Sequence, residues 1–139
     1  MTQKLKILTL SRKMEVAYNN KQYQVCKDLA LKVLLLMPEN LNSLRGYALS
    51  CFFLEEYEES MMFLLKALEI SKEKEFEYTY IGWCLCNMNN HIKACEAFEK
   101  AVEANPLYEP ALVGRTSAYV HLHSDRLDVV NKLDEKFNA

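Results

Sequence analysis

Two pairs of residues place potential metal ligands close together in the sequence. Cys84 and Cys86 form one pair, and His121 and His123 form the other. Zinc sites usually combine a Cys-x-x-Cys pair with a second pair at a distance, and neither pair here has such a counterpart. Residues two apart on a helix also point about 200° away from each other. We therefore expect Cys84 and Cys86 to fill small positions in a helix interface, and we expect no metal site.

No other combination of residues predicts catalysis or cofactor binding. Gly46, Gly82 and Gly114 are far apart and fall inside expected helices, so they do not form a glycine-rich phosphate loop. The placement of serine, histidine and aspartate suggests no catalytic triad. We expect no catalytic residue, no cofactor and no enzymatic activity.

Composition and charge exclude several other classes of protein. Seventeen basic and nineteen acidic residues are interleaved along the chain, whereas nucleic-acid binding usually needs a clustered basic face. No run approaches the roughly 20 apolar residues of a membrane span. Five cysteines, an odd number, occur without a secretory signal at the start, which indicates free thiols. We expect a cytoplasmic protein.

Helices are the expected secondary structure because the chain holds only three glycines and three prolines. One stretch contains, in order, Gly82, Ala94, Phe98, Ala101 and Pro106. Similar residue types recur along the chain with a period of about 34 residues, and this stretch shows the pattern most clearly. At these spacings the stretch resembles the tetratricopeptide repeat, a helix pair that stacks on its neighbours. Small residues let two helix axes approach to about 8–10 Å. Proline cannot continue a helix and so fixes the turn into the next unit.

The period divides the chain into repeats at about 7–40, 41–74 and 75–108, with a capping helix pair at 109–139. The second helices have their tightest contact at Cys26, Ser60 and Ala94. Two further repeat positions follow it, with Ala30, Leu64 and Phe98 at one and Val33, Ala67 and Ala101 at the other. In the last unit these positions hold Asp128, Lys132 and Glu135, as a water-exposed end of a stack would.

The resemblance implies a single domain, 1–139, that is all-α. We expect a right-handed superhelical stack of antiparallel helix pairs, about eight helices in all. Their expected ranges are 4–20 and 22–37, 40–54 and 57–71, 75–88 and 91–104, and 108–122 and 124–137. The last of these carries an apolar stripe at helical spacing, formed by Leu127, Val130, Leu133 and Phe137.

In the family that this chain resembles, the first helix of each pair lines a concave groove that binds the partner. Carried over position by position, the resemblance implies an apolar and aromatic groove of Tyr18, Arg45, Leu49, Phe52, Phe53, Phe76, Trp83, Cys86, Val113 and Val120. The positions at which relatives clamp the acidic tails of heat-shock chaperones hold Ser11, Glu15, Gly46, Phe76 and Tyr80 here, so the clamp is absent. A competing interpretation is that some of these aromatic residues are ordinary core.

An apolar groove suits the apolar face of a helix or an extended hydrophobic peptide of a partner protein. The length and the aromatic inner face are similar to those of small tetratricopeptide chaperones of bacterial type III secretion systems. The alternative is a scaffold or adaptor that links folded partners without a chaperone role. Either protein could form a homodimer or a heterodimer.

Overall fold

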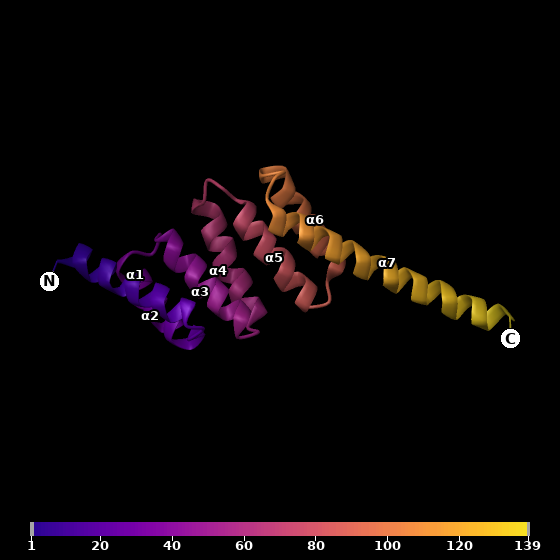
Figure 1. The fold of residues 1–139 in the computed structure, drawn as a ribbon, viewed down its shortest axis with the longest axis horizontal. Helices are drawn as coiled ribbons and strands as arrows, with labels where there is room; N and C mark the ends of the chain where they lie inside the picture. The colour runs from indigo at the N-terminus through magenta and orange to yellow at the C-terminus, as the bar shows by residue number, and fades with distance from the viewer. Residues whose placement is uncertain (1, 139) are drawn as a thin grey trace.

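The computed structural model describes residues 2–138, and over that range it consists of helices joined by short turns (Figure 1). The helices in order are α1 (Gln3–Asn19), α2 (Tyr23–Leu36), α3 (Leu41–Phe53), α4 (Tyr57–Ile70), α5 (Glu75–Asn87), α6 (His91–Ala104) and α7 (Glu109–Asn138). Each helix packs on the next, and α1 also contacts α3, as α5 contacts α7. The first helices of the repeats therefore lie side by side, and the predicted stack of antiparallel helix pairs is confirmed.

Three matching turns connect the two helices within each repeat. Lys21, Glu55 and Asn89 occupy the same position of successive repeats and adopt left-handed backbone angles, with φ of 59°, 63° and 60°. In the first turn, the Gln22 N–H donates to the Ala17 carbonyl at 2.8 Å, and the other two turns repeat this hydrogen bond. The bond satisfies a carbonyl that the end of the helix would otherwise leave unpaired. The left-handed conformation costs a non-glycine residue roughly 1–2 kcal/mol, so the packing of the following helix must offset it.

The second helix of each full repeat ends in one of two ways. Pro38 and Pro106 follow the last residues of α2 and α6 by two positions and prevent those helices from continuing. After α4 the equivalent position holds Lys72. There the Lys74 ammonium donates to the backbone carbonyls of Ser71, at 2.8 Å, and of Leu68. A lysine thus caps the one full repeat that lacks a proline.

The predicted close contacts of the second helices are confirmed at every position of the three full repeats. All nine residues have no exposed surface: Cys26, Ser60, Ala94, Ala30, Leu64, Phe98, Val33, Ala67 and Ala101. The buried Ser60 hydroxyl donates to the Ala48 carbonyl at 2.7 Å, which joins α4 to α3. The core is therefore a line of close contacts that recurs once in every repeat.

The predicted capping pair is wrong in one respect, because α7 runs unbroken from Glu109 to Asn138. The expected turn near His123, the position that corresponds to Asn89 of the preceding repeat, does not form. A turn there would need a residue with strained, left-handed backbone angles. A helix that folded back after this turn would also place Asp128, Lys132 and Glu135 at contact positions that need small or apolar residues. Continuing the helix avoids both costs. Within residues 2–138, no helix combines the length and apolar character needed to cross a bilayer.

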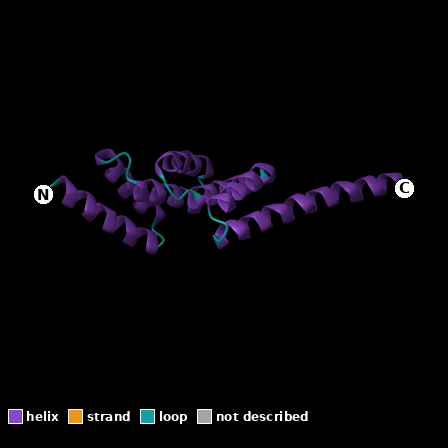
Figure 2. Cartoon of the chain, turned by 90° about the horizontal axis from the view of Figure 1, so that it is seen from above, coloured by secondary structure: helices purple, strands orange, loops and turns teal. Residues whose placement is uncertain are grey.

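The straight α7 carries the chain well beyond the other helices, so the two ends of the chain lie at opposite ends of the molecule in both views (Figures 1 and 2). The predicted apolar stripe on this segment begins with Leu127, which is exposed. Its other members, Val130, Leu133 and Phe137, lie outside the residues whose side chains are described.

Phe98 holds the last three helices together. Its ring is fully buried on α6 and faces Gly82 of α5 and Gly114 of α7. A Cβ atom at position 82 would lie 2.6 Å from Phe98 Cε1, and one at position 114 would overlap the same ring even more severely. Both glycines therefore provide the space that the phenylalanine fills.

We predict that Gly114→Ala destabilises the protein, although alanine is the better helix former. The substitution normally gains roughly 0.5–1 kcal/mol in a helix, but overpacking against Phe98 should cost about 1–3 kcal/mol. Gly46→Ala is the matched control, because its Cβ would meet only the flexible Met14 side chain, at 3.1 Å. Urea unfolding followed by circular dichroism measures both. An unfolding free energy of Gly114→Ala equal to or above that of the parent would contradict the close packing of Phe98 against Gly114.

Candidate functional site

A cavity of about 600 Å³ opens between α1, α3 and α5, and we call it the inner cavity. Tyr18, Leu49 and Phe76 contribute its large apolar walls. The other lining residues are Leu8, Ser11, Arg12, Met14, Glu15, Cys26, Asn42, Arg45 and Gly46. Four of the ten predicted groove residues, Tyr18, Arg45, Leu49 and Phe76, therefore meet around one hollow.

Arg45 is held at the edge of the inner cavity from several sides. Its Nε donates to the Glu77 carboxylate at 2.6 Å, and its Nη2 donates to the Ser71 hydroxyl at 3.0 Å. The guanidinium carbon lies 4.8 Å from the centre of the Phe76 ring, in a cation–π contact. Glu77 is fully buried, so the ion pair with Arg45 has little water around it. The pair joins the second repeat to the third and fixes the direction of the arginine.

A continuous series of aromatic contacts follows the inner helices. Phe53 stacks on Tyr23 with ring centres 4.9 Å apart and meets Phe52 edge-on at 5.4 Å. Phe52 contacts Tyr80 at 5.6 Å, and Tyr80 contacts Phe76 at 4.9 Å. Phe53 remains 44% exposed, whereas burial raises the pKa of the Tyr80 hydroxyl. The series therefore connects the inner cavity to the turn end of the first repeat.

The remaining predicted groove residues differ in their surroundings. Trp83 and Cys86 are half-buried and pack against the core, and the Trp83 ring meets Phe98 edge-on at 5.3 Å. Val113 and Val120 lie on α7 and are 62% and 58% exposed. A groove role for these four, as for the other six, stays a prediction.

Eight residues that line the inner cavity are not among the ten predicted groove residues: Leu8, Ser11, Arg12, Met14, Glu15, Cys26, Asn42 and Gly46. Arg12 and Gly46 are one repeat period apart and so share one repeat position, which the clamp of relatives also uses. A signal was present at Gly46, because a glycine within a helix indicates a close neighbour. That neighbour is the Met14 sulfur.

One cluster outside the groove brings together the kinds of groups that bind metals. The Cys51 sulfur and carboxylate oxygens of Glu56 and Glu59 lie within 4.8 Å of one another. The Lys27 ammonium already occupies this cluster, 2.8 Å from Glu56 and 3.8 Å from Glu59. The Tyr47 hydroxyl also donates to Glu59 and contributes most to the lowered pKa of that carboxyl. The cluster is therefore an ion pair between the first two repeats.

His121, one of the two histidines that the sequence singled out, contacts the preceding helix. The His121 ring stacks on His91 of α6, with ring centres 4.8 Å apart and planes 10° apart. His121 Nδ1 lies 2.8 Å from the Ser117 carbonyl, so this nitrogen carries the proton and donates it. The His91–His121 stack thus helps to place α7 against α6.

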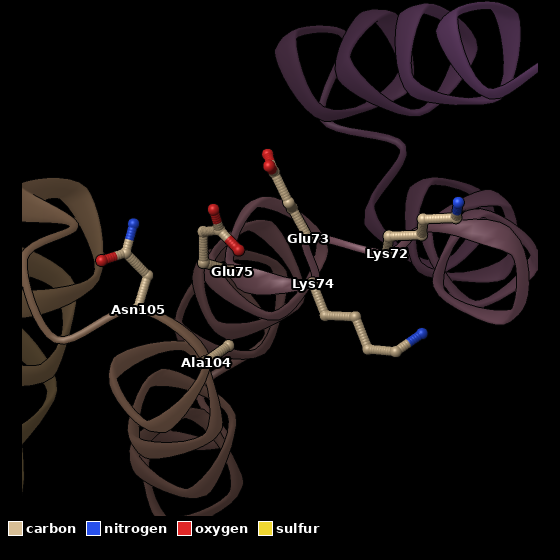
Figure 3. A pocket seen from close by; sticks show the side chains of 6 residues that line it. All are labelled: Lys72, Glu73, Lys74, Glu75, Ala104 and Asn105. Atoms are coloured by element: carbon tan, nitrogen blue, oxygen red, sulfur yellow. The ribbon is translucent and has the colours of Figure 1, made fainter.

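A second hollow, of about 460 Å³, lies where the α4–α5 loop meets the end of α6 (Figure 3). Its lining is mostly charged, with Glu73 and Glu75 on one side and Asn105 facing them. The Lys74 side chain extends away from both glutamates, toward the carbonyls that it caps. Ala104 is the only apolar residue among those that line this hollow, so the inner cavity is the better candidate for binding a partner.

The comparisons with known proteins agree with this geometry. The tetratricopeptide repeat family model matches residues 46–74 and 78–106. The Sgt2 tetratricopeptide domain from Aspergillus fumigatus is 19% identical with a TM-score of 0.79, over 87% of this chain and 82% of that one. The first tetratricopeptide domain of Spaghetti (RPAP3), bound to the HSP90 peptide SRMEEVD, is 18% identical with a TM-score of 0.79, over 86% and 94%. MamA is 18% identical with a TM-score of 0.78, over 96% and 81%.

No curated protein matches the chain in sequence. The two matched segments follow the predicted second and third repeats closely, and the solved structures share the fold over most of the chain. The family model thus identifies tetratricopeptide repeats at 46–74 and 78–106, and the solved structures show that the chain shares their fold.

We predict that Arg45→Met lowers the unfolding free energy by about 3–5 kcal/mol, because it leaves the buried Glu77 carboxylate without its partner. The double variant Arg45→Met with Glu77→Leu should recover most of this loss, since apolar groups of similar size can replace a buried ion pair. Urea unfolding measures all three proteins. If the single variant were as stable as the parent, the buried ion pair would not exist.

We predict that stability falls as the pH rises from about 8.5 to 10, because burial keeps several thiols neutral in the folded protein. Desolvation raises the pKa of Cys84 and of Cys86 to about 11 and that of Cys51 to about 12. An unfolded thiol releases its proton near a pH of about 8.5. Over this window the folded state binds more protons, so each thiol costs at most about 1.4 kcal/mol per pH unit.

Urea unfolding at several pH values tests this dependence. Cys84→Ala removes one of the three groups and should give a shallower decline. A flat profile over this window would show that the folded thiols ionise normally.

Proposed function

We propose that this chain binds an apolar or amphipathic segment of a partner protein on its inner helices. The observation that supports the proposal is the inner cavity, where Tyr18, Leu49 and Phe76 form one hollow between three repeats. Aromatic residues provide large contact areas with few rotatable bonds, and such residues carry much of the energy in peptide interfaces. The exposed Phe53 extends this surface toward the first turn. The role is that of a binding module, without catalysis.

The chemistry of the inner cavity favours an apolar ligand over the acidic tail that one structural neighbour binds. The peptide SRMEEVD in that neighbour carries three carboxylate side chains. In this chain Glu15 lines the inner cavity, and Glu77 already neutralises Arg45. Arg12 also lines the inner cavity, but its charge is offset by that of Glu15. An acidic ligand would therefore meet no net positive charge, whereas an apolar side chain would meet apolar walls.

The proposal covers the binding step that a type III secretion chaperone and an adaptor have in common. Co-expression separates these two roles. A chaperone should keep soluble a client that aggregates when it is made alone, whereas an adaptor should bind a partner that is already soluble. Free, neutral thiols at Cys26, Cys51, Cys84, Cys86 and Cys95 fit a cytoplasmic location for either role.

Selection from a display library of random peptides tests the proposal directly. We expect the selected peptides to be rich in apolar residues and to bind in the inner cavity. Leu49→Glu should weaken their binding by about thirtyfold or more, equivalent to about 2 kcal/mol, because it buries a charge in the contact. Fluorescence anisotropy with labelled peptides measures the affinity.

Leu35→Glu is the matched control, since Leu35 is 84% exposed on the outer helix α2 and should not change the affinity. Thermal unfolding must show that both variants remain folded. Peptides that bind Leu49→Glu as well as the parent would place the binding surface elsewhere on the stack.

A further inference from the structure

Both ends of the stack expose apolar surface. At the N-terminal end, a hollow of about 450 Å³ lies between α1 and α2, and we call it the head hollow. Val16 and Val25 line it and are 58% and 48% exposed, and the half-buried Leu29 lines it as well. Arg12 and Lys13 add two basic residues to the lining. In the interior of the stack, the corresponding face of a repeat is covered by the repeat before it.

At the other end, the projecting part of α7 carries apolar residues on one face. Among its described side chains, none beyond Ala118 is buried. Val113, Val120 and Leu127 follow one another at heptad spacing and are 62%, 58% and 51% exposed. Residues at heptad spacing lie on nearly the same line along a helix. We call the part of this line from Val120, where α7 leaves α6, through Leu127 to Asp134 the tail row.

The charges of the two ends are complementary. The helix α1 holds four basic residues and a single acidic one, and Arg12 and Lys13 are its basic residues at the head hollow. The next position of the tail row after Leu127 is Asp134, which is exposed. At about 100° per residue, the basic residues Arg126 and Lys132 fall on other sides of the helix. The tail row thus presents apolar groups followed by an acid, and the head hollow presents apolar groups beside bases.

From this complementarity we infer that the tail row of one copy docks in the head hollow of a second copy. The two surfaces lie at opposite ends of one chain and cannot meet within it (Figure 1). The part of α7 after Leu122, which packs on the core, runs to Asn138 and extends about 24 Å, which is long enough to lie along a helix pair. Because the two surfaces differ, the contact is heterologous, and each added copy leaves one free head and one free tail.

Two variants, each with one end disrupted, test the inference. Val16→Glu places an acid in the head hollow opposite Asp134, and Leu127→Glu places a charge in the tail row. Both positions are exposed and outside the core, so the fold should remain intact, which thermal unfolding checks. We expect the parent to form chains whose average mass rises steadily with concentration in sedimentation equilibrium. Each variant alone should remain a monomer.

The mixture of the two variants is the decisive measurement. Leu127→Glu retains an intact head and Val16→Glu retains an intact tail, so together they should form a complex of twice the chain mass and no larger. Leu107→Glu is the control, because Leu107 is 88% exposed in the α6–α7 loop and away from both ends, and it should assemble like the parent.

Three outcomes would overturn the inference. The first is a parent that stays monomeric at every accessible concentration. The second is a mixture that stays monomeric although the parent assembles. The third is a dimer of Val16→Glu alone, which would indicate symmetric pairing of two α7 helices instead of head-to-tail docking.

Discussion

The packing of Phe98 between Gly82 and Gly114 is the contact on which the C-terminal half of the structure depends. One fully buried ring sets the separation of α5, α6 and α7, because the two glycines leave only enough space for that ring. The position of α7 then follows from α6 and not from a second helix of its own. A last repeat with only one helix can remain attached because its buried contacts, at Ala111, Gly114 and Ala118, all face the preceding pair.

The buried ion pair between Arg45 and Glu77 plays a different part, since it links stability to the candidate site. A neutral aliphatic pair would fill the same volume at similar or lower free energy. The ion pair instead fixes a planar guanidinium over Phe76 at the edge of the inner cavity, with hydrogen bonds on two of its nitrogens. The same side chain therefore joins two repeats and shapes the wall of the hollow, so the geometry of the groove is tied to the relative position of the repeats.

The repeat period predicted much of the fold because every full repeat meets the same physical demand at the same positions. Cys26, Ser60 and Ala94 differ chemically, yet each is small enough for the closest contact of two helices, and each is fully buried. The inner cavity was predicted only in part, because a family pattern gives the repeat position of a residue but does not say which side chains it contacts. Arg45 and Glu77 come from different repeats, and neither the period nor local spacing indicates that they pair. The unbroken α7 was missed for a related reason: a missing turn depends on the balance between backbone strain and packing gain.

This balance also explains why the outermost helix differs from the interior ones. Lys21, Glu55 and Asn89 accept left-handed angles because a well-packed helix follows each of them. At the equivalent His123 the following segment offers charged residues at the contact positions, so the strain would not be offset and the helix stays straight. A straight helix exposes Val120 and Leu127, which a folded-back pair would have covered at least in part. The charged residues at the contact positions of the last unit, Asp128, Lys132 and Glu135, thus end the array of helix pairs. The same residues leave the tail row on α7 exposed and open to a second molecule.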